Sequence, residues 1–251
     1  MCLIKNGSVY VWDTVIKSCD SDQTRQISLS SILKFQQEIG ERHLTKINMD
    51  YEKIFDELGL IFVFTRINTV IHRRPTIGEK VHITTWCKNL KGIQYYRCYR
   101  FKTESGELLI DSIGASATVD AKTHKLFRPQ SIQAFNAIVC DDVTETTCPM
   151  PKKIPATENV DFSVYRTVMY SDTDYNGHLN NCVYANFISD YIPGGMSNKN
   201  ITGFSIDFQG EAFPGETLNI GVKSFENKAC FTGLHTRGKC FQSVCFYENL
   251  Q

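Results

Sequence analysis

The densest group of polar side chains in the sequence is the run 172–181, which reads DTDYNGHLNN. A strand-like segment at 162–170 precedes it and a helix-like segment follows it, so the run is expected to form a turn from a strand into a helix. A helix N-terminus offers unpaired backbone N–H groups and a positive dipole end, and both would stabilise an oxyanion. The side chains of Asn176 and His178 could also polarise a carbonyl group or hold water. The competing interpretation is an Asx-rich turn that only caps the helix.

Glu211 is the second candidate for chemistry. It follows the strongly apolar segment 204–208, which is expected to be a strand. A carboxylate at the end of such a strand could accept a proton as a general base. The alternative is an exposed loop glutamate without a chemical role.

Two similar regions of β-branched and aromatic residues must position these groups. In the first, strands are expected at 60–73, 79–88, 93–103 and 107–119; in the second, at 201–208, 217–224, 228–235 and 239–247. Apolar residues at helical spacing predict a helix over 29–44, with Ser28 as its N-cap, and another over 181–191. A short helix is expected at 51–58, with Asp50 as its cap and Gly59 as its end.

The two regions match as internal copies. At an offset of 152, Asp20 and Asp22 correspond to Asp172 and Asp174, and at an offset of 137 the segment 75–79 corresponds to 212–216. Duplication predicts an α+β protein in which each unit wraps an antiparallel sheet around one long helix. The expected units are 1–128 and 161–251, joined by a Pro-containing linker at 129–160.

The polar groups are present in only one copy. The first copy has Thr24, Gln26 and Ser28 where the second has Asn176, His178 and Asn180, and it has Arg74 where the second has Glu211. Purely structural residues have no evident reason to gather in one copy. Loss of a site from the first copy explains the asymmetry better, which favours a functional interpretation of the second.

Composition excludes several classes of protein. The chain has 251 residues, with 27 basic and 27 acidic side chains, so it lacks the basic excess typical of nucleic-acid binders. Its ten cysteines include no C-x-x-C pair, which disfavours a zinc or redox site. The first residues do not form a secretory signal or a transit peptide, and no apolar run is long enough to span a membrane. We therefore expect a cytoplasmic protein with reduced thiols and without stable membrane insertion.

In its motifs and in its duplicated pattern, the sequence resembles the acyl-ACP thioesterases of plant plastids and their bacterial relatives. The resemblance extends over nearly the whole chain, through the segments 66–101, 112–129, 170–193 and 207–218. The family pattern D-x-N-x-H-x-N-N is present as Asp174, Asn176, His178, Asn180 and Asn181.

The resemblance implies a tandem hot-dog fold and hydrolysis of fatty acyl thioesters, with the family's glutamate at Glu211. Asn176 and His178 would hold the water, the base or the carbonyl oxygen, Asp174 would orient them, and the N–H groups of Gly177 and His178 could form the oxyanion hole. Many plant members have a cysteine at the next position. Here it is Ala212, which excludes a cysteine mechanism at that position. Whether Glu211 acts as general base or attacks directly is left open.

The partner implied by the resemblance is the acidic acyl carrier protein, with its acyl chain in a tunnel built largely from the first unit. Candidate contacts for the carrier are Arg73, Arg74, Arg97 and Arg100, although each alone is better explained as ordinary surface charge. No metal and no organic cofactor are implied, and a bacterial member is expected. An acyl-CoA thioesterase and a non-catalytic acyl-binding protein are the rival interpretations. Chain length, saturation preference and a homodimeric state are left open.

Overall fold

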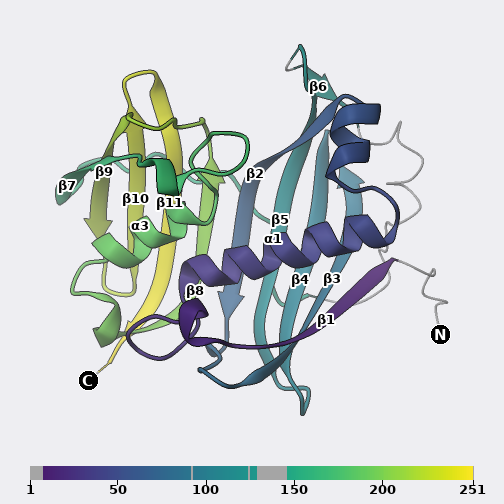
Figure 1. Ribbon diagram of the computed structural model, residues 1–251. Helices are drawn as coiled ribbons and strands as arrows, with labels where there is room; N and C mark the ends of the chain where they lie inside the picture. Colours follow the sequence, from purple (N-terminus) through teal and green to yellow (C-terminus); the bar gives the residue numbers. More distant parts are fainter. Residues whose placement is uncertain (1–7, 92, 124, 129–145, 251) are drawn as a thin grey trace.

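The computed structural model describes the chain except for residues 1–7, 92, 124, 129–145 and 251. The described strands form one antiparallel sheet, and the two long helices α1 (Leu29–Lys46) and α3 (Val183–Tyr191) cover the same face of it (Figure 1). The first half adds β1 (Val9–Val15), β2 (Leu60–Ile71), β3 (Lys80–Lys91), β4 (Gln94–Thr103), β5 (Leu108–Asp120), β6 (Leu126–Phe127) and the π-helical turn η2 (Lys53–Glu57). The second half adds β7 (Phe162–Thr167), β8 (Lys199–Phe208), β9 (Thr217–Ser224), β10 (Lys228–His235) and β11 (Gly238–Asn249). Short 3₁₀ turns occupy Ser18–Asp20 (η1), Tyr170–Asp172 (η4) and Met196–Asn198 (η5).

The strand order repeats itself in reverse, as a duplication requires. It runs β1-β3-β4-β5-β2-β8-β11-β10-β9-β7, so that each of these five strands of the first half has its counterpart at the mirrored place in the second, while β6 pairs with β5 off this path. This arrangement is a double hot-dog, and the expected α+β class with one long helix on each antiparallel half is confirmed. The domain boundaries stay a prediction: residues 129–145 of the expected linker lie outside the described residues, and 146–160 form neither helix nor strand.

Local sequence explains where α1 begins and which face it buries. The hydroxyl of Ser28 accepts a hydrogen bond from the Ser31 N–H (3.1 Å), which confirms the N-cap. Leu29, Ile32 and Ile39 recur at helical spacing and are fully buried against the sheet. Burial of this stripe, more than intrinsic propensity, holds such a helix in place.

Some elements differ from expectation. Strand β1, an edge strand, was not expected, although its sequence VYVWDTV is rich in the β-branched and aromatic residues typical of strands. The offset of 152 that relates the two copies would have revealed it, since it carries 162–167 onto 10–15. Strand β7 ends at Thr167 because Tyr170–Asp172 tightens into a 3₁₀ turn, and α3 begins two residues later than predicted.

The two halves meet where β2 pairs with β8 in antiparallel register, at the centre of the sheet. The paired residues run from Arg66 opposite Asp207 to Val70 opposite Gly203. At the middle of this register Asn68 faces Ser205, which is its own copy at the offset of 137, so a pseudo-twofold axis passes between them. The Ser205 hydroxyl donates to the Asn68 side chain (2.5 Å), and Arg66 forms an ion pair with Asp207 (2.9 Å).

One continuous core fills the space between the sheet and the two helices. A single cluster of buried apolar side chains contains Ile32 and Phe101 from the first half together with Phe187 and Phe204 from the second. The two halves therefore do not bury separate cores, and their relative placement is fixed by packing as well as by the β2–β8 pairing. No helix in the described part of the chain is both long and apolar enough to cross a membrane.

Two glycine substitutions test this junction. A Cβ at Gly203 would lie 2.6 Å from the backbone oxygen of Thr69 in the neighbouring strand, whereas a Cβ at Gly40 on α1 would make only ordinary contacts with Arg97 and Tyr99. Gly203→Ala should lower the free energy of unfolding by about 1–3 kcal/mol, because strand backbones must move apart. Gly40→Ala should raise it by about 1 kcal/mol through helix propensity. Urea unfolding measures both, and unchanged stability in Gly203→Ala would contradict the close β2–β8 approach.

Candidate active site

The run 172–181 folds into a tight turn held by its own aspartates. Asp172 accepts hydrogen bonds from the Met169 N–H (2.9 Å) and from the guanidinium of Arg166, which fixes the start of the turn. The Asp174 carboxylate accepts the N–H groups of Asn176 (2.9 Å) and, at longer range, His178 (3.4 Å). Asp174 therefore shapes the loop that presents these two side chains.

A turn with the same backbone hydrogen bonds exists in the first half. Asp22 receives the Thr24 N–H (2.8 Å) as Asp174 receives that of Asn176. Each turn also contains one left-handed residue at the corresponding position, Arg25 (φ 64°) in the first half and Gly177 (φ 76°) in the second. This correspondence confirms the alignment of the two copies that the sequence offset indicated.

The structure brings His178 and Glu211 together from two distant segments. Nδ1 of His178 lies 3.6 Å from Oε1 of Glu211. The His178 side chain is 32% exposed and that of Glu211 is 53% exposed, so the pair is open to a ligand from solvent. The edge of the His178 ring packs on Phe213, with ring centroids 5.0 Å apart. This separation is longer than a direct hydrogen bond, so a proton would pass between the carboxylate and the imidazole only through a closer approach or one bridging water.

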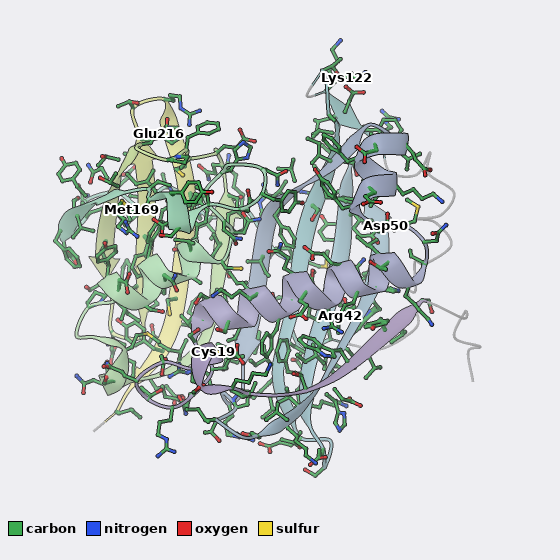
Figure 2. The ribbon with its side chains drawn as sticks, in the orientation of Figure 1. Cys19, Arg42, Asp50, Lys122, Met169 and Glu216 are labelled. Carbon is green, nitrogen blue, oxygen red and sulfur yellow. The ribbon has the colours of Figure 1, made fainter. Side chains whose placement is uncertain are left out.

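Arg237 fastens the loop that carries Glu211, and sequence reasoning missed it. Its guanidinium binds both carboxylate oxygens of Glu216 (2.9 Å each) and donates to the backbone oxygen of Glu211 (2.8 Å). It also lies over the Phe213 ring, 4.9 Å from the centroid, on the side chain that supports His178. The hydrogen bonds from Arg237 lower the pKa of the Glu216 carboxyl, which keeps this clamp ionised. In Figure 2, Glu216 and Met169 lie at the same end of the second half; Met169 comes shortly before the turn 172–181.

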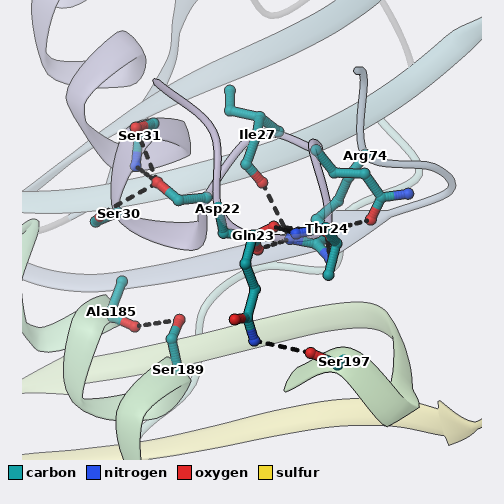
Figure 3. A network of polar contacts seen from close by, with 12 residues as sticks. Asp22, Gln23, Thr24, Ile27, Ser30, Ser31, Arg74, Ala185, Ser189 and Ser197 are labelled. Carbon is teal, nitrogen blue, oxygen red and sulfur yellow. Dashed lines mark hydrogen bonds and ion pairs between the residues drawn. The ribbon is translucent and has the colours of Figure 1, made fainter. Parts of the chain in front are cut away.

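In the first half the equivalent position is closed by an ion pair (Figure 3). Arg74, the counterpart of Glu211, binds Asp22 (2.5 Å), the counterpart of Asp174. It also donates to the hydroxyl of Thr24 (3.2 Å) and to the backbone oxygen of Ile27 (3.2 Å). In the second half two carboxylates occupy these places, so no such pair can form and Glu211 extends toward His178.

The two N–H groups expected to form an oxyanion hole already have partners within the turn, and their catalytic role stays a prediction. The Gly177 N–H donates to the backbone oxygen of Asp174 (3.0 Å), and the His178 N–H is directed at the Asp174 carboxylate. Both donors are therefore occupied inside the turn. Helix α3 starts only at Val183, and the side chain of Asn180 accepts the N–H of Cys182 (2.9 Å), the residue that precedes the helix.

The remaining motif residues separate into different surroundings. Asn176 is exposed at the tip of the turn. Asn180 binds the N–H of Cys182 just before α3, and Asn181 lines a small cavity at the junction of the two halves. Tyr175 packs edge-on against Tyr51 of the first half, with ring centroids 5.0 Å apart, so the turn also contacts the other half of the chain. Of the side chains expected to act on a substrate, His178 and Glu211 are the pair that the structure places side by side.

The four arginines expected to meet a carrier protein are not free surface charges. Arg74 is buried in the ion pair described above, and Arg97 is buried beneath α1, where it contacts His43 (2.8 Å). Arg100 forms a two-pronged pair with buried Asp111 on the opposite face of β4. Burial contradicts a docking role for these three, because their charges are already engaged inside the protein. Arg73 is the most exposed of the four, at 39%, and pairs with two glutamates.

The cysteines near the site are buried thiols. Burial raises the pKa of Cys182 to about 12 and that of Cys240 to about 11. Cys240 lies 3.4 Å from the hydroxyl of Tyr184, whose pKa is also raised by burial. Within the described residues no three His, Cys, Asp or Glu side chains are close enough together to hold a metal ion.

Comparison with known proteins agrees with this architecture. Residues 7–132 match the family model of the acyl-ACP thioesterase N-terminal domain, and residues 156–239 match that of the C-terminal domain. The chain is 25% identical over 216 residues to oleoyl-acyl carrier protein thioesterase 1 of Arabidopsis thaliana, a chloroplastic protein, covering 76% of this chain and 57% of that one. The chain spans about half the length of the curated plant relatives that it matches.

Two solved structures share the fold across nearly their full length. An acyl-ACP thioesterase from Bacteroides thetaiotaomicron superimposes with a TM-score of 0.87 at 18% identity, covering 98% of this chain and 100% of that one. A 12:0-ACP thioesterase from Umbellularia californica gives 0.85 at 17% identity, covering 96% and 98%.

Thiol labelling tests the surroundings of the site. At pH 8 iodoacetamide should modify exposed Cys19 and leave Cys182 and Cys240 unmodified in the folded protein, because a raised pKa keeps the last two as unreactive thiols. Peptide mass spectrometry after brief labelling reads out each position, and labelling in urea provides the control for reactivity. Rapid modification of folded Cys182 would show that the start of α3 is open to solvent.

Proposed function

The chain belongs to the acyl-ACP thioesterase family, and we propose that it hydrolyses fatty acyl thioesters carried on acyl carrier protein. The products would be free fatty acid and the carrier with its free thiol, so the reaction would end chain elongation. The observation that carries the proposal is the contact of His178 with Glu211, formed in only one of two otherwise matching turns. Hydrolysis of a thioester needs a base that a substrate can reach from solvent, and in the second half Glu211 is such a base.

In the proposed reaction Glu211 acts as the general base. Water attacks the carbonyl carbon of the thioester while Glu211 takes one of its protons. The tetrahedral adduct then expels the carrier's thiolate as the C–S bond breaks, and the proton is returned to sulfur. His178 holds Glu211 in place, and Asn176, at the exposed tip of the turn, is available to the carbonyl oxygen or the water. Asp174 acts through the turn that it shapes.

The group that carries the acyl chain in the preferred substrate distinguishes an acyl-ACP thioesterase from an acyl-CoA thioesterase. We propose acyl carrier protein as the partner because the family models covering both halves are those of acyl-ACP thioesterases. Thiol release from acyl-ACP and from acyl-CoA of equal chain length, measured side by side, should favour the carrier protein. Tight acyl binding without thiol release would instead indicate a non-catalytic acyl-binding protein. The proposed reaction uses no metal and no organic cofactor, and chelators should leave the rate unchanged. A cytoplasmic location and a bacterial source stay predictions.

Glu211→Gln should abolish turnover while the protein stays folded. The change keeps the shape of the side chain and removes its basic oxygen, and loss of a general base costs about 10²–10⁴ in rate. Thiol release with saturating acyl-ACP measures the effect, and Glu226→Gln, in an exposed turn of the same half, is the matched control. Near-normal hydrolysis by Glu211→Gln would overturn the assignment of the base.

Arg237→Met should lower kcat by about 10- to 100-fold, because small displacements of a reacting group are costly. The variant releases both the Glu211 backbone and the Phe213 support of His178. Arg237→Lys should recover little, since an ammonium cannot bind Glu216 with two parallel hydrogen bonds. Lys239→Met, two residues away on an exposed part of β11, controls for loss of charge. Equal rates for Arg237→Met and Lys239→Met would mean that the clamp does not position the site.

A further inference from the structure

Cys240, near the start of β11, holds the loop that carries Glu211 with both its backbone and its side chain. The N–H groups of Gln209 and Gly210 donate to the backbone oxygen of Cys240 (2.8 and 3.0 Å). In the opposite direction, the Cys240 thiol donates to the backbone oxygen of Gly210 (3.4 Å). The residue that directly precedes Glu211 is therefore bound at its N–H and at its carbonyl group by one cysteine.

A buried tyrosine extends this contact into the core. The hydroxyl of Tyr184, on α3, lies 3.4 Å from Sγ of Cys240. A thiol has a single proton, and here it is directed at the backbone oxygen of Gly210, so the Tyr184 hydroxyl must be the donor to sulfur. The Tyr184 ring packs edge-on against Phe208 and Phe241, which fixes the hydroxyl in place. Two donors in series thus connect α3 to the loop.

The Tyr184 hydroxyl is also close to the charged groups of the site. Burial raises the pKa of Tyr184, the Cys240 thiol raises it further, and the carboxylates of Glu211 and Asp174 add to the shift. The phenol therefore stays protonated and able to donate. Its side chain is 3% exposed, so water does not compete for the hydrogen bond to sulfur.

The first half has the same backbone arrangement with apolar side chains in place of the two donors. The N–H groups of residues 72–73 donate to the backbone oxygen of Leu109 (2.9 and 3.3 Å), so Leu109 corresponds to Cys240. At the offset of 152, Ile32 corresponds to Tyr184. Leu109 and Ile32 are both fully buried. An apolar pair is thus sufficient to pack this position, and the hydroxyl and thiol occur in the copy that has the glutamate.

We propose that Tyr184 and Cys240 are positioning residues for Glu211, which hold the carbonyl group before it so that its carboxylate stays beside His178. This inference rests on the proposed thioesterase function. Arg237 holds the carbonyl group of Glu211 itself from the surface (2.8 Å), and the Tyr184–Cys240 relay holds the preceding one from the core. Fixing the loop on both sides limits displacement of the base, and small displacements of a reacting group are costly in rate.

The first test removes the Tyr184 hydroxyl and keeps the packing of its ring. Tyr184→Phe should lower kcat for acyl-ACP about three- to tenfold, the effect of one net hydrogen bond, and should leave KM unchanged. Tyr247→Phe is the matched control and should keep the wild-type kcat. Tyr247 is equally buried, and its hydroxyl also donates to backbone oxygens, those of Phe225 and Lys228, but at the other end of β11.

The second test separates hydrogen bonding by Cys240 from its packing. Cys240→Ala should lower kcat as Tyr184→Phe does, and Cys240→Ser should recover most of the rate, because a hydroxyl also accepts and donates. Cys245→Ala, at a fully buried cysteine of the same strand, controls for the lost volume. The double variant Tyr184→Phe/Cys240→Ala should be no slower than either single variant, since the two residues act as one unit. Equal rates for Cys240→Ala and Cys240→Ser would show a packing role and overturn the inference.

Amide hydrogen exchange provides a measurement that does not depend on turnover. The segment 209–212 should exchange faster in Tyr184→Phe than in the wild type and in Tyr247→Phe, because the loop opens more often. If the wild type releases no thiol from acyl-ACP and this difference is found, the proposed function fails and the relay remains as the support of the loop. If thioesters are hydrolysed and Tyr184→Phe matches Tyr247→Phe in kcat, the inference is wrong. A loss of kcat with an equally large rise in KM would show general loosening and would also overturn it.

Discussion

The pairing of β2 with β8 is the contact on which the rest of the molecule depends. It turns two half-sheets into one sheet and sets α1 and α3 side by side on the same face. Because Asn68 lies opposite its own copy, Ser205, the five main strands of one half have counterparts at the symmetric places in the other. A shift of register by one residue would exchange the buried and exposed faces of both strands. The shared core therefore allows only one arrangement of the halves.

This symmetry makes the difference between the two turns informative. Both turns have the same backbone, held by Asp22 in one half and by Asp174 in the other. In the first half a buried arginine neutralises the aspartate and seals the position. In the second half a glutamate replaces the arginine, and like charges do not pair, so the carboxylate turns outward to the histidine. One change of charge sign separates a closed structural turn from an open site with a base.

The site also depends on residues that hold it without touching a substrate. Arg237 connects the loop of Glu211 to Phe213, and Phe213 supports the ring of His178. Tyr175 reaches from the same turn to Tyr51 in the other half. The first half thus contributes a contact to the site although its own turn is closed. This division explains why a duplicated fold can keep both copies while only one keeps the chemistry.

The sequence by itself determined the repeated elements, the cap at Ser28, the duplication and the motif from Asp174 to Asn181. These follow from local periodicity and from spacing along the chain, which a single sequence displays directly. Only the tertiary structure decided that the N–H groups of Gly177 and His178 are already occupied, that Arg97 is buried beneath α1, and that Arg237 clamps Glu216. The physical reason is that a charged or polar side chain takes its role from its partner. Strand register and core packing decide which side chains that are distant in the sequence become hydrogen-bond or ion-pair partners. The composition of the chain and the spacing of residues along it do not contain that information.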